Sequence, residues 1–310
     1  MNARDEHSRL IRAGLLNGLV AYGWWGLVPI YFKAVAHVAP LAVLAHRVVW
    51  SVFFLVIVIA AQHRWREVLA IVRDRRMLLT LVASTAMVSI NWLLFIYAMM
   101  INQVLQSSLA YFINPLLFVL MAVVLLKERL RAAQVVAIVV AGAGVAYMTL
   151  RSGQVPWLAL GMAGSFAVYG LLRKVAPVSP LIGLTVETLL LFPVALAASA
   201  WFFARDLSSG AVNPHTYGLL VLAGIVTTVP LLAFAAAARR LPLSTIGFLQ
   251  YIAPTGQFLL AVFLYDEPFT RTHAISFCCI WTGLAIFSLS SLHEYHRRER
   301  LLRSPEVNLA

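Results

Sequence analysis

The segments Leu109-Ala-Tyr-Phe-Ile-Asn-Pro115 and Phe248-Leu-Gln-Tyr-Ile-Ala-Pro254 decide the fold, because they present nearly the same pattern twice at an offset of 139 residues. The match continues at that offset to Glu128 and Glu267. A match sustained in this way indicates an internal duplication. If each copy holds five membrane spans, the second copy enters the bilayer from the opposite side. That is the inverted-repeat architecture of many secondary transporters.

Composition predicts an integral membrane protein, because 62% of the residues are hydrophobic and only 12% are charged. A helix of about 20 apolar residues crosses a hydrocarbon core of about 30 Å. Stretches of this kind are expected at residues 13–33, 41–61, 78–100, 104–126, 132–150, 156–172, 181–203, 215–238, 244–264 and 272–292. The predicted fold class is an all-α integral membrane protein with ten transmembrane helices in two inverted five-helix repeats.

The repeat divides the chain into two tails and two halves. Residues 1–12 form the expected cytoplasmic N-terminal tail, 13–150 the first repeat, 151–292 the second, inverted repeat and 293–310 the cytoplasmic C-terminal tail. The first apolar stretch runs on without a small-residue cleavage site. It therefore predicts a retained span rather than a signal peptide.

The loop charges predict the orientation, because Lys and Arg accumulate in short cytoplasmic loops. With both termini inside, nineteen basic residues face the cytoplasm: Arg4, Arg9, Arg12, Arg64, Arg66, Arg73, Arg75, Arg76, Lys127, Arg129, Arg131, Arg173, Lys174, Arg239, Arg240, Arg297, Arg298, Arg300 and Arg303. Four face outward: Lys33, Arg151, Arg205 and Arg271. The net charge of +12 thus follows from topology and attraction to anionic lipids, and no nucleic-acid partner is expected.

The sequence contains no motif for ATP binding, metal binding or catalysis. There is no GxxxxGK[ST] phosphate loop for ATP, and the two cysteines, Cys278 and Cys279, are adjacent in one span. No paired acid–base set or metal-ligand motif occurs at an interface. We expect no enzymatic activity, no metal and no cofactor, and energy drawn from gradients. The expected partners are a small-molecule substrate and membrane lipids, while the oligomeric state stays open.

Three ionisable side chains within spans are the first candidates for function, because such a group costs at least about 2.5 kcal/mol to insert. They are His46 and Arg47 in the second span and Glu187 in the seventh. At an offset of 141 residues, two more than before and as a change in the length of one loop would produce, His46 and Glu187 correspond in the two repeats. A central pair of Glu187 with His46 or with Arg47 is therefore one hypothesis. The alternative is that these side chains lie near span ends and extend toward the headgroups.

Polar and aromatic residues beside prolines form a second group of candidates. They are Tyr111, Asn114 and Pro115 in the fourth span and Gln250, Tyr251 and Pro254 in the ninth. A proline inside a helix kinks it and frees backbone carbonyls, which a substrate or a neighbouring side chain must satisfy. The lining of a binding site would be completed by Trp24, Trp50, Asn91, Trp92 and Tyr97. The alternative is that the prolines only bend their helices.

Glu128 and Glu267 directly follow the fourth and ninth spans, on opposite sides of the membrane in the inverted arrangement. We expect them to cap and anchor neighbouring helices at the interface. A role in gating is the alternative.

Together, these patterns resemble the EamA type of the drug/metabolite transporter superfamily, and in particular its RarD subgroup of chloramphenicol-sensitivity-associated permeases. The strings that carry the resemblance are Trp25-Gly26, His46-Arg47-x-x-Trp50, Asn91-Trp92-Leu-Leu-Phe-Ile96, Tyr111-Phe-Ile-Asn-Pro115, Gly224-Ile-Val-Thr-Thr-Val-Pro-Leu231 and Gly247-Phe-x-Gln-Tyr-Ile252. The resemblance implies a multi-pass protein of the bacterial plasma (inner) membrane with a central cavity between its halves, and it favours export. It supplies no substrate.

The expected function is secondary-active transport of a small polar or amphipathic metabolite or drug by alternating access. Arg47 would bind an anionic group and Glu187 would pair with Arg47 or take up a proton. A passive facilitator or channel is the alternative. A membrane enzyme and a non-transporting sensor are disfavoured, because the chain shows neither catalytic motifs nor a soluble signalling domain.

Overall fold

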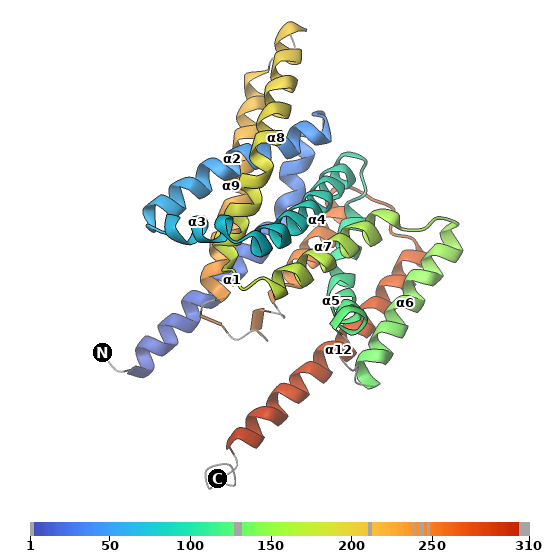
Figure 1. Cartoon of the computed structure of the whole chain (residues 1–310). Coiled ribbons are helices and arrows are strands. Elements are labelled where there is room, and N and C mark those ends of the chain that lie inside the picture. The colour runs from blue at the N-terminus through green and yellow to red at the C-terminus, as the bar shows by residue number, and fades with distance from the viewer. Residues whose placement is uncertain are drawn as a thin grey trace. The chain divides into compact units, whose positions relative to one another are not determined.

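The computed structural model describes residues 3–126, 132–209, 213–238, 240–241, 245–246 and 249–303, and these residues contain helices and no strand. Figure 1 shows the course of the chain. The helices are α1 (Ala3–Ala34), α2 (Pro40–Ala61), α3 (Trp65–Arg73), α4 (Arg75–Met100), α5 (Val104–Leu126), α6 (Ala132–Ser152), α7 (Trp157–Val175), α8 (Pro180–Ser208), α9 (Pro214–Ala238), α11 (Ile252–Leu259), the π-helix η1 (Leu260–Leu264) and α12 (Arg271–Arg303).

The apolar helices agree with the stretches expected from the sequence. Among the described residues, seven helices are long and apolar enough to cross a membrane, namely parts or all of α1, α2, α4, α6, α8, α9 and α12. Three shorter apolar segments, Val104–Leu117, Trp157–Arg173 and Ile252–Leu264, overlap with the remaining predicted spans but are too short to be counted with the seven. By length and composition the chain is a multi-pass membrane protein.

The chain forms two compact units, and each draws on both halves of the sequence. The first comprises Met1–Tyr111 and Leu158–Glu267, and the second comprises Phe112–Trp157 and Pro268–Ala310. Within the first unit, α2 packs against α8 and α9, and α1 packs against α9 and α11. Within the second, α6 lies along α12 (Figure 1).

Glycines set the close approach of helices in both units. In the first unit, a β-carbon on Gly256 of α11 would lie 3.0 Å from the Cα atom of Gly26 of α1. In the second, a β-carbon on Gly144 of α6 would lie 2.7 Å from Cβ of Cys279, and one on Gly283 of α12 would lie 2.6 Å from the carbonyl of Ala137. These positions exclude any larger residue unless the backbones move apart.

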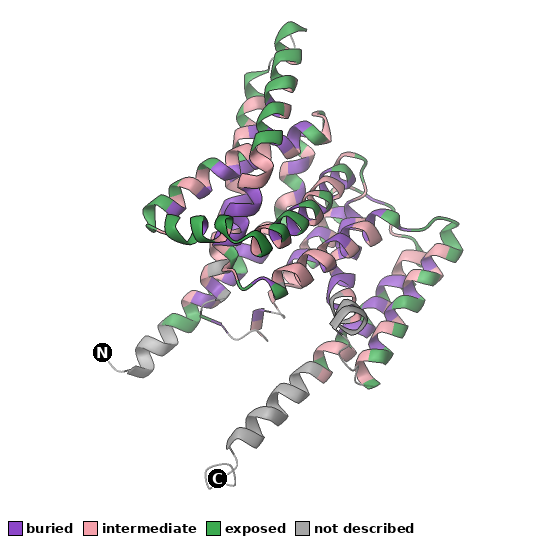
Figure 2. Cartoon of the chain, in the orientation of Figure 1, coloured by how far each residue is buried: buried purple, intermediate pink, exposed green. Residues whose placement is uncertain are grey.

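Figure 2 shows exposed residues along many of the helices. Many of the exposed side chains are large and apolar, such as Leu79, Val139, Val194 and Phe263, which are exposed by 70%, 63%, 72% and 74%. A soluble protein rarely exposes so much apolar surface, whereas lipid tails cover it at little cost.

Two features of the helices differ from the sequence expectation. The connection between the second and third predicted spans contains α3, whose Val68 is buried and whose first turn is joined by an ion pair from Arg64 to Glu67 at 2.6 Å. The predicted N-terminal tail is helical from Ala3 onward, and α12 continues to Arg303. The last residues of the expected C-terminal tail, 304–310, lie outside the described residues.

Candidate functional site

Arg47 lies in α2, and side chains of three other helices of the first unit surround it. Its Nε donates a hydrogen bond to Oγ1 of Thr227 on α9 at 2.9 Å. Its Cζ atom lies 4.3 Å from the ring centroid of Trp92 on α4 and 5.7 Å from that of Phe32 on α1. Residues from α1, α4 and α9 therefore fix the plane of the guanidinium.

The charge of Arg47 has no partner of opposite sign in the described part of the chain. No carboxylate there lies within 4.0 Å of it, and its two terminal nitrogens make no hydrogen bond to a described residue. A half-buried cation in a span is thus left with two donor groups available.

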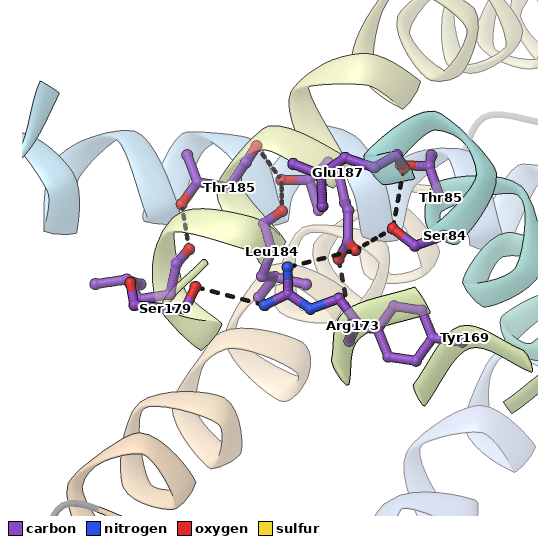
Figure 3. A network of polar contacts seen from close by, with 11 residues as sticks. Ser84, Thr85, Tyr169, Arg173, Ser179, Leu184, Thr185 and Glu187 are labelled. Atoms are coloured by element: carbon purple, nitrogen blue, oxygen red, sulfur yellow. Dashed lines mark hydrogen bonds and ion pairs between the residues drawn. The ribbon is translucent and has the colours of Figure 1, made fainter. Parts of the chain in front are cut away.

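Glu187 of α8 is fully buried and receives contacts from two other helices (Figure 3). The hydroxyl of Ser84 on α4 donates to Oε1 at 2.6 Å, and the hydroxyl of Tyr169 on α7 donates to Oε2 at 3.3 Å. The guanidinium of Arg173, also on α7, forms an ion pair with Oε1 at 3.9 Å. All three partners belong to the first unit.

The hypothesis that Glu187 pairs with His46 or Arg47 is therefore wrong, because Arg173 takes that place. Arg173 lies near the end of α7, only a few residues before α8 begins, and its Nη2 also donates to the carbonyl of Ser179 at 3.4 Å. The ring of His46 instead meets the ring of Tyr217 on α9, edge to face, with 5.7 Å between centroids.

Hydrogen bonds join α1, α5 and α11 beside Pro254. The hydroxyl of Ser107 donates to Oε1 of Gln257 at 2.8 Å, and Nε2 of Gln257 donates to the carbonyl of Trp25 at 3.1 Å. The hydroxyl of Ser108 donates to the carbonyl of Pro254 at 2.9 Å. Neighbouring side chains therefore already form hydrogen bonds with polar groups next to Pro254, including its own carbonyl, without a substrate.

The candidates next to the two prolines occupy different settings. Pro254 is in the first turn of α11, and Gln250 and Tyr251, both half-buried, form the turn directly before it. Pro115 lies inside the continuous helix α5, in the second unit, and the Oδ1 atom of Asn114 is buried there without a hydrogen-bond partner among the residues that the structure describes.

The other predicted lining residues are spread over the first unit. Tyr111 at its boundary meets the rings of Phe95 and Phe166 at 6.3 and 6.5 Å. Trp24 is half-buried, Tyr97 is 38% exposed, and the indole Nε1 of Trp50 is buried with no hydrogen-bond partner in the described part of the chain.

Asn91 has a structural role in this conformation. It is buried, and its Nδ2 donates to the carbonyl of Met162 on α7 at 2.8 Å. It therefore ties α4 to α7.

Glu267 caps α5, as the sequence predicts. Its two carboxylate oxygens accept hydrogen bonds from the backbone N–H groups of Val104 at 2.6 Å and Leu105 at 2.7 Å. These N–H groups have no partner within a helix, so the contact anchors the start of α5. Burial nevertheless raises the pKa of Glu267 above its ordinary value. Glu128, its counterpart in the repeat, lies outside the described residues.

Sequence reasoning missed several residues of these clusters: Ser84, Thr227, Gln257, Tyr169 and Arg173. Arg173 was counted as a loop cation at the cytoplasmic face. A usable signal was the spacing of Tyr169 and Arg173, since residues four apart lie on one face of a helix. The hydroxyl residues give no such signal, because Ser and Thr are common in membrane helices.

Comparison with known proteins identifies two successive matches to one family. The EamA-like transporter family matches residues 12–150 and again residues 155–289. An "Uncharacterized transporter" of Vibrio cholerae is 44% identical over 290 residues, which cover 93% of this chain and 96% of that protein. "Protein RarD" of Escherichia coli K12 is 41% identical over 292 residues, covering 93% of this chain and 98% of that protein.

A more distant relative and a solved structure are also similar. The "Chloramphenicol-sensitive protein RarD" of Pseudomonas aeruginosa is 29% identical, covering 94% of this chain and 99% of that protein. A crystal structure with 21% identity matches with a TM-score of 0.57 over 89% of this chain and 97% of the other. At that identity the likeness speaks for the fold alone.

Proposed function

Because this chain belongs to the EamA-like transporter family, and within it to the RarD subgroup, we propose that it is a secondary-active exporter of small polar or amphipathic anions, metabolites or drugs, working by alternating access. The family establishes membrane transport in general. The mechanism, the direction and the substrate are our proposal. The single observation that carries the substrate class is the guanidinium of Arg47 among α1, α2, α4 and α9, which has no carboxylate partner among the described residues.

The free-energy cost of placing the charged side chain of Arg47 in a membrane span supports an anionic substrate. A charged side chain near the middle of a membrane helix costs about 2.5–3.5 kcal/mol on insertion scales, and an ion partner usually offsets it. No described carboxylate does so for Arg47. A carboxylate on the substrate would supply the missing charge and accept hydrogen bonds from both terminal nitrogens.

The aromatic surroundings favour a substrate with an apolar or flat body. Trp92 and Phe32 flank the guanidinium, and the ring of Tyr111 lies among Phe95 and Phe166. Binding sites for small molecules are typically mostly apolar, with a few polar groups that fix orientation. Arg47 would hold the charged end, and the rings would contact the rest of the molecule.

The proposed arrangement places ten spans in two inverted repeats, both termini in the cytoplasm and the protein in the plasma membrane. The two successive family matches and the nineteen basic residues assigned to cytoplasmic segments support it. A passive facilitator or channel remains the alternative, since an inverted duplication is compatible with both.

Thermal unfolding of the purified protein with a panel of ligands tests the anion site. The panel holds benzoate, phenylacetate, phenylalanine and chloramphenicol, the last because one relative is named for sensitivity to it. A ligand at 100 times its dissociation constant stabilises by about 2.7 kcal/mol. We expect a carboxylate to stabilise the wild type and not Arg47→Ala.

The matched control is Arg205→Ala, because Arg205 also lies over aromatic rings, those of Trp201 and Phe202, but is exposed. It should respond to the carboxylate as the wild type does. A carboxylate that stabilises Arg47→Ala as strongly as the wild type would remove Arg47 from the site.

A further inference from the structure

The surroundings of Glu187 single out one charged partner in the described part of the chain. From α4, Ser84 faces the carboxylate, and from α7, Tyr169 and Arg173 do so. Next to this site α8 packs through apolar residues: Ile182 and Val186 cluster with Ile59 of α2, Val68 of α3 and Leu81 of α4. Arg173 is thus the one described cation facing Glu187, and Tyr169 is the one other titratable group.

The contacts of Glu187 differ in how they depend on a proton. The hydroxyls of Ser84 and Tyr169 donate to a carboxylate, and they also accept from a carboxylic acid. The ion pair with Arg173 needs the negative charge. Nη1 of Arg173 lies 3.9 Å from Oε1 and makes no hydrogen bond to a described residue, so charge attraction alone holds that nitrogen among the described side chains. A proton on Glu187 therefore leaves its hydroxyl contacts intact and removes the charge attraction that holds Nη1 of Arg173. The hydrogen bond from Nη2 to the carbonyl of Ser179, at 3.4 Å, is then the contact that remains.

Arg173 occupies a place where its release changes the junction of α7 and α8. Its Nη2 donates to the carbonyl of Ser179, the residue before α8, and the hydroxyl of Ser179 accepts from Nη2 of Arg64 at 3.1 Å. The guanidinium lies over Gly183 in the second turn of α8, where a β-carbon would overlap with it. The missing side chain of Gly183 provides the space in which Arg173 reaches Glu187.

We propose that Glu187 and Arg173 form a proton-operated latch, in which uptake of a proton by Glu187 releases Arg173 and frees the end of α7 from α8. The inference rests on the proposed transport function, for which the latch would be the coupling site. By the proposed orientation it lies toward the cytoplasmic end of the first unit. Proton binding and the closed state of this end would then exclude each other, as coupling to a proton gradient requires.

Hydrogen–deuterium exchange of the full-length protein in detergent tests the latch without a substrate. Amide protection in residues 166–178 is measured between about pH 5 and pH 8 and corrected for the intrinsic dependence of exchange on pH. In the wild type we expect protection to decrease as the pH decreases. The decrease is up to about tenfold per pH unit in the range where the open state binds one more proton than the closed state. In Glu187→Gln we expect low protection at every pH.

Gly183→Ala keeps Glu187 and displaces only the guanidinium of Arg173, so it serves if Glu187→Gln fails to fold. We expect the same low and pH-independent protection. Gly164→Ala is the matched control, because Gly164 lies on α7 like Arg173 and a β-carbon there meets nothing within 4 Å. Its protection should follow the wild type.

Two results would overturn the latch. One is wild-type protection that does not change with pH in residues 166–178, and the other is a wild-type pH dependence that persists in Glu187→Gln and Gly183→Ala. Either result leaves the proposed function standing if the same samples still show carboxylate stabilisation that depends on Arg47. If the carboxylate does not stabilise the protein but protection in residues 166–178 still depends on pH through Glu187, the anion site is rejected and the latch is kept.

Discussion

The guanidinium of Arg47 lies over the indole of Trp92, with 4.3 Å between Cζ and the ring centroid. The hydrogen bond from Nε to Thr227 holds the same group from α9. One edge and one face of the guanidinium are thus occupied by protein, and the terminal nitrogens make no hydrogen bond to a described residue. An arginine held in this way is pre-organised to receive a carboxylate.

Replacing Trp92 by leucine should weaken binding of the carboxylate that stabilises the wild type. A cation–π contact contributes about 0.5 to 2 kcal/mol, so we expect a dissociation constant raised by roughly 2- to 30-fold, with Trp92→Phe in between. Isothermal titration measures it. Trp201→Leu is the control, since Trp201 lies over Arg205 and is 60% exposed. Equal affinity in Trp92→Leu and the wild type would show that the indole does not support the site.

Gly256→Ala should destabilise the contact of α1 with α11. Its β-carbon would lie 3.0 Å from the Cα atom of Gly26, and neither backbone has a flexible side chain to move away. Overpacking of this kind costs about 1–3 kcal/mol, which a lower midpoint of thermal unfolding reports. Gly23→Ala in α1 meets nothing within 4 Å and should leave the midpoint unchanged or raise it. A tolerated Gly256→Ala would mean that the two helices are not in close contact.

Gln257→Leu should also lower stability, because it leaves the hydroxyl of Ser107 and the carbonyl of Trp25 without their buried partner. An unsatisfied buried polar group costs about 1–3 kcal/mol. Ser107→Ala removes only one of the two contacts and should cost less. Denaturation in the same detergent compares the stability of the two variants. A loss of stability in Gln257→Leu that is equal to or smaller than that in Ser107→Ala would contradict the bridging role of Gln257.

Glu267→Gln should change how stability depends on pH. Because burial raises the pKa of Glu267, the folded protein binds that proton more tightly than the unfolded chain does. This contribution is complete below about pH 4.5 and is lost as pH rises through the folded pKa. Glutamine cannot titrate, so the unfolding midpoint of the variant should rise relative to that of the wild type above about pH 4.5.

Glu67→Gln serves for comparison, because the pKa of Glu67 is shifted in the opposite direction to that of Glu267. The hydrogen bond from Arg64 lowers the pKa of Glu67, so its contribution is present above the ordinary pKa and is lost as pH falls through the folded pKa. The wild type should therefore lose stability relative to Glu67→Gln as pH falls. Unfolding midpoints with the same pH trend in both variants would contradict the assignment for Glu267.

The apolar helices could be predicted from the sequence because a membrane span needs a long apolar stretch, and the predicted start at residue 104 coincides with that of α5. Helix α3 could not, because it has nine residues and only part of its surface is apolar. The first and last helices extend into the predicted tails, since backbone hydrogen bonds can continue into water after the apolar stretch ends.

Within the site, Arg47 and Glu187 could be selected because a charge in a span is costly and rare. Their partners could not, because pairing depends on how helices rotate and where they end. Correspondence in the repeat pointed to His46 as the partner of Glu187, whereas Arg173 reaches the carboxylate from the end of α7 across Gly183. Thr227 belongs to one of the strings that carry the family resemblance, but only the packing of α2 against α9 brings it to Arg47.

Counterflow in proteoliposomes tests alternating access most directly. Vesicles are loaded with an excess of the unlabelled carboxylate that stabilises the protein most, and uptake of the labelled compound from outside is followed over time. Alternating access at Arg47 predicts a transient overshoot, saturation with concentration and loss of both in Arg47→Ala but not in Arg205→Ala. Uptake that rises linearly with concentration, without an overshoot and unchanged in Arg47→Ala, would contradict a carrier and indicate a passive pore.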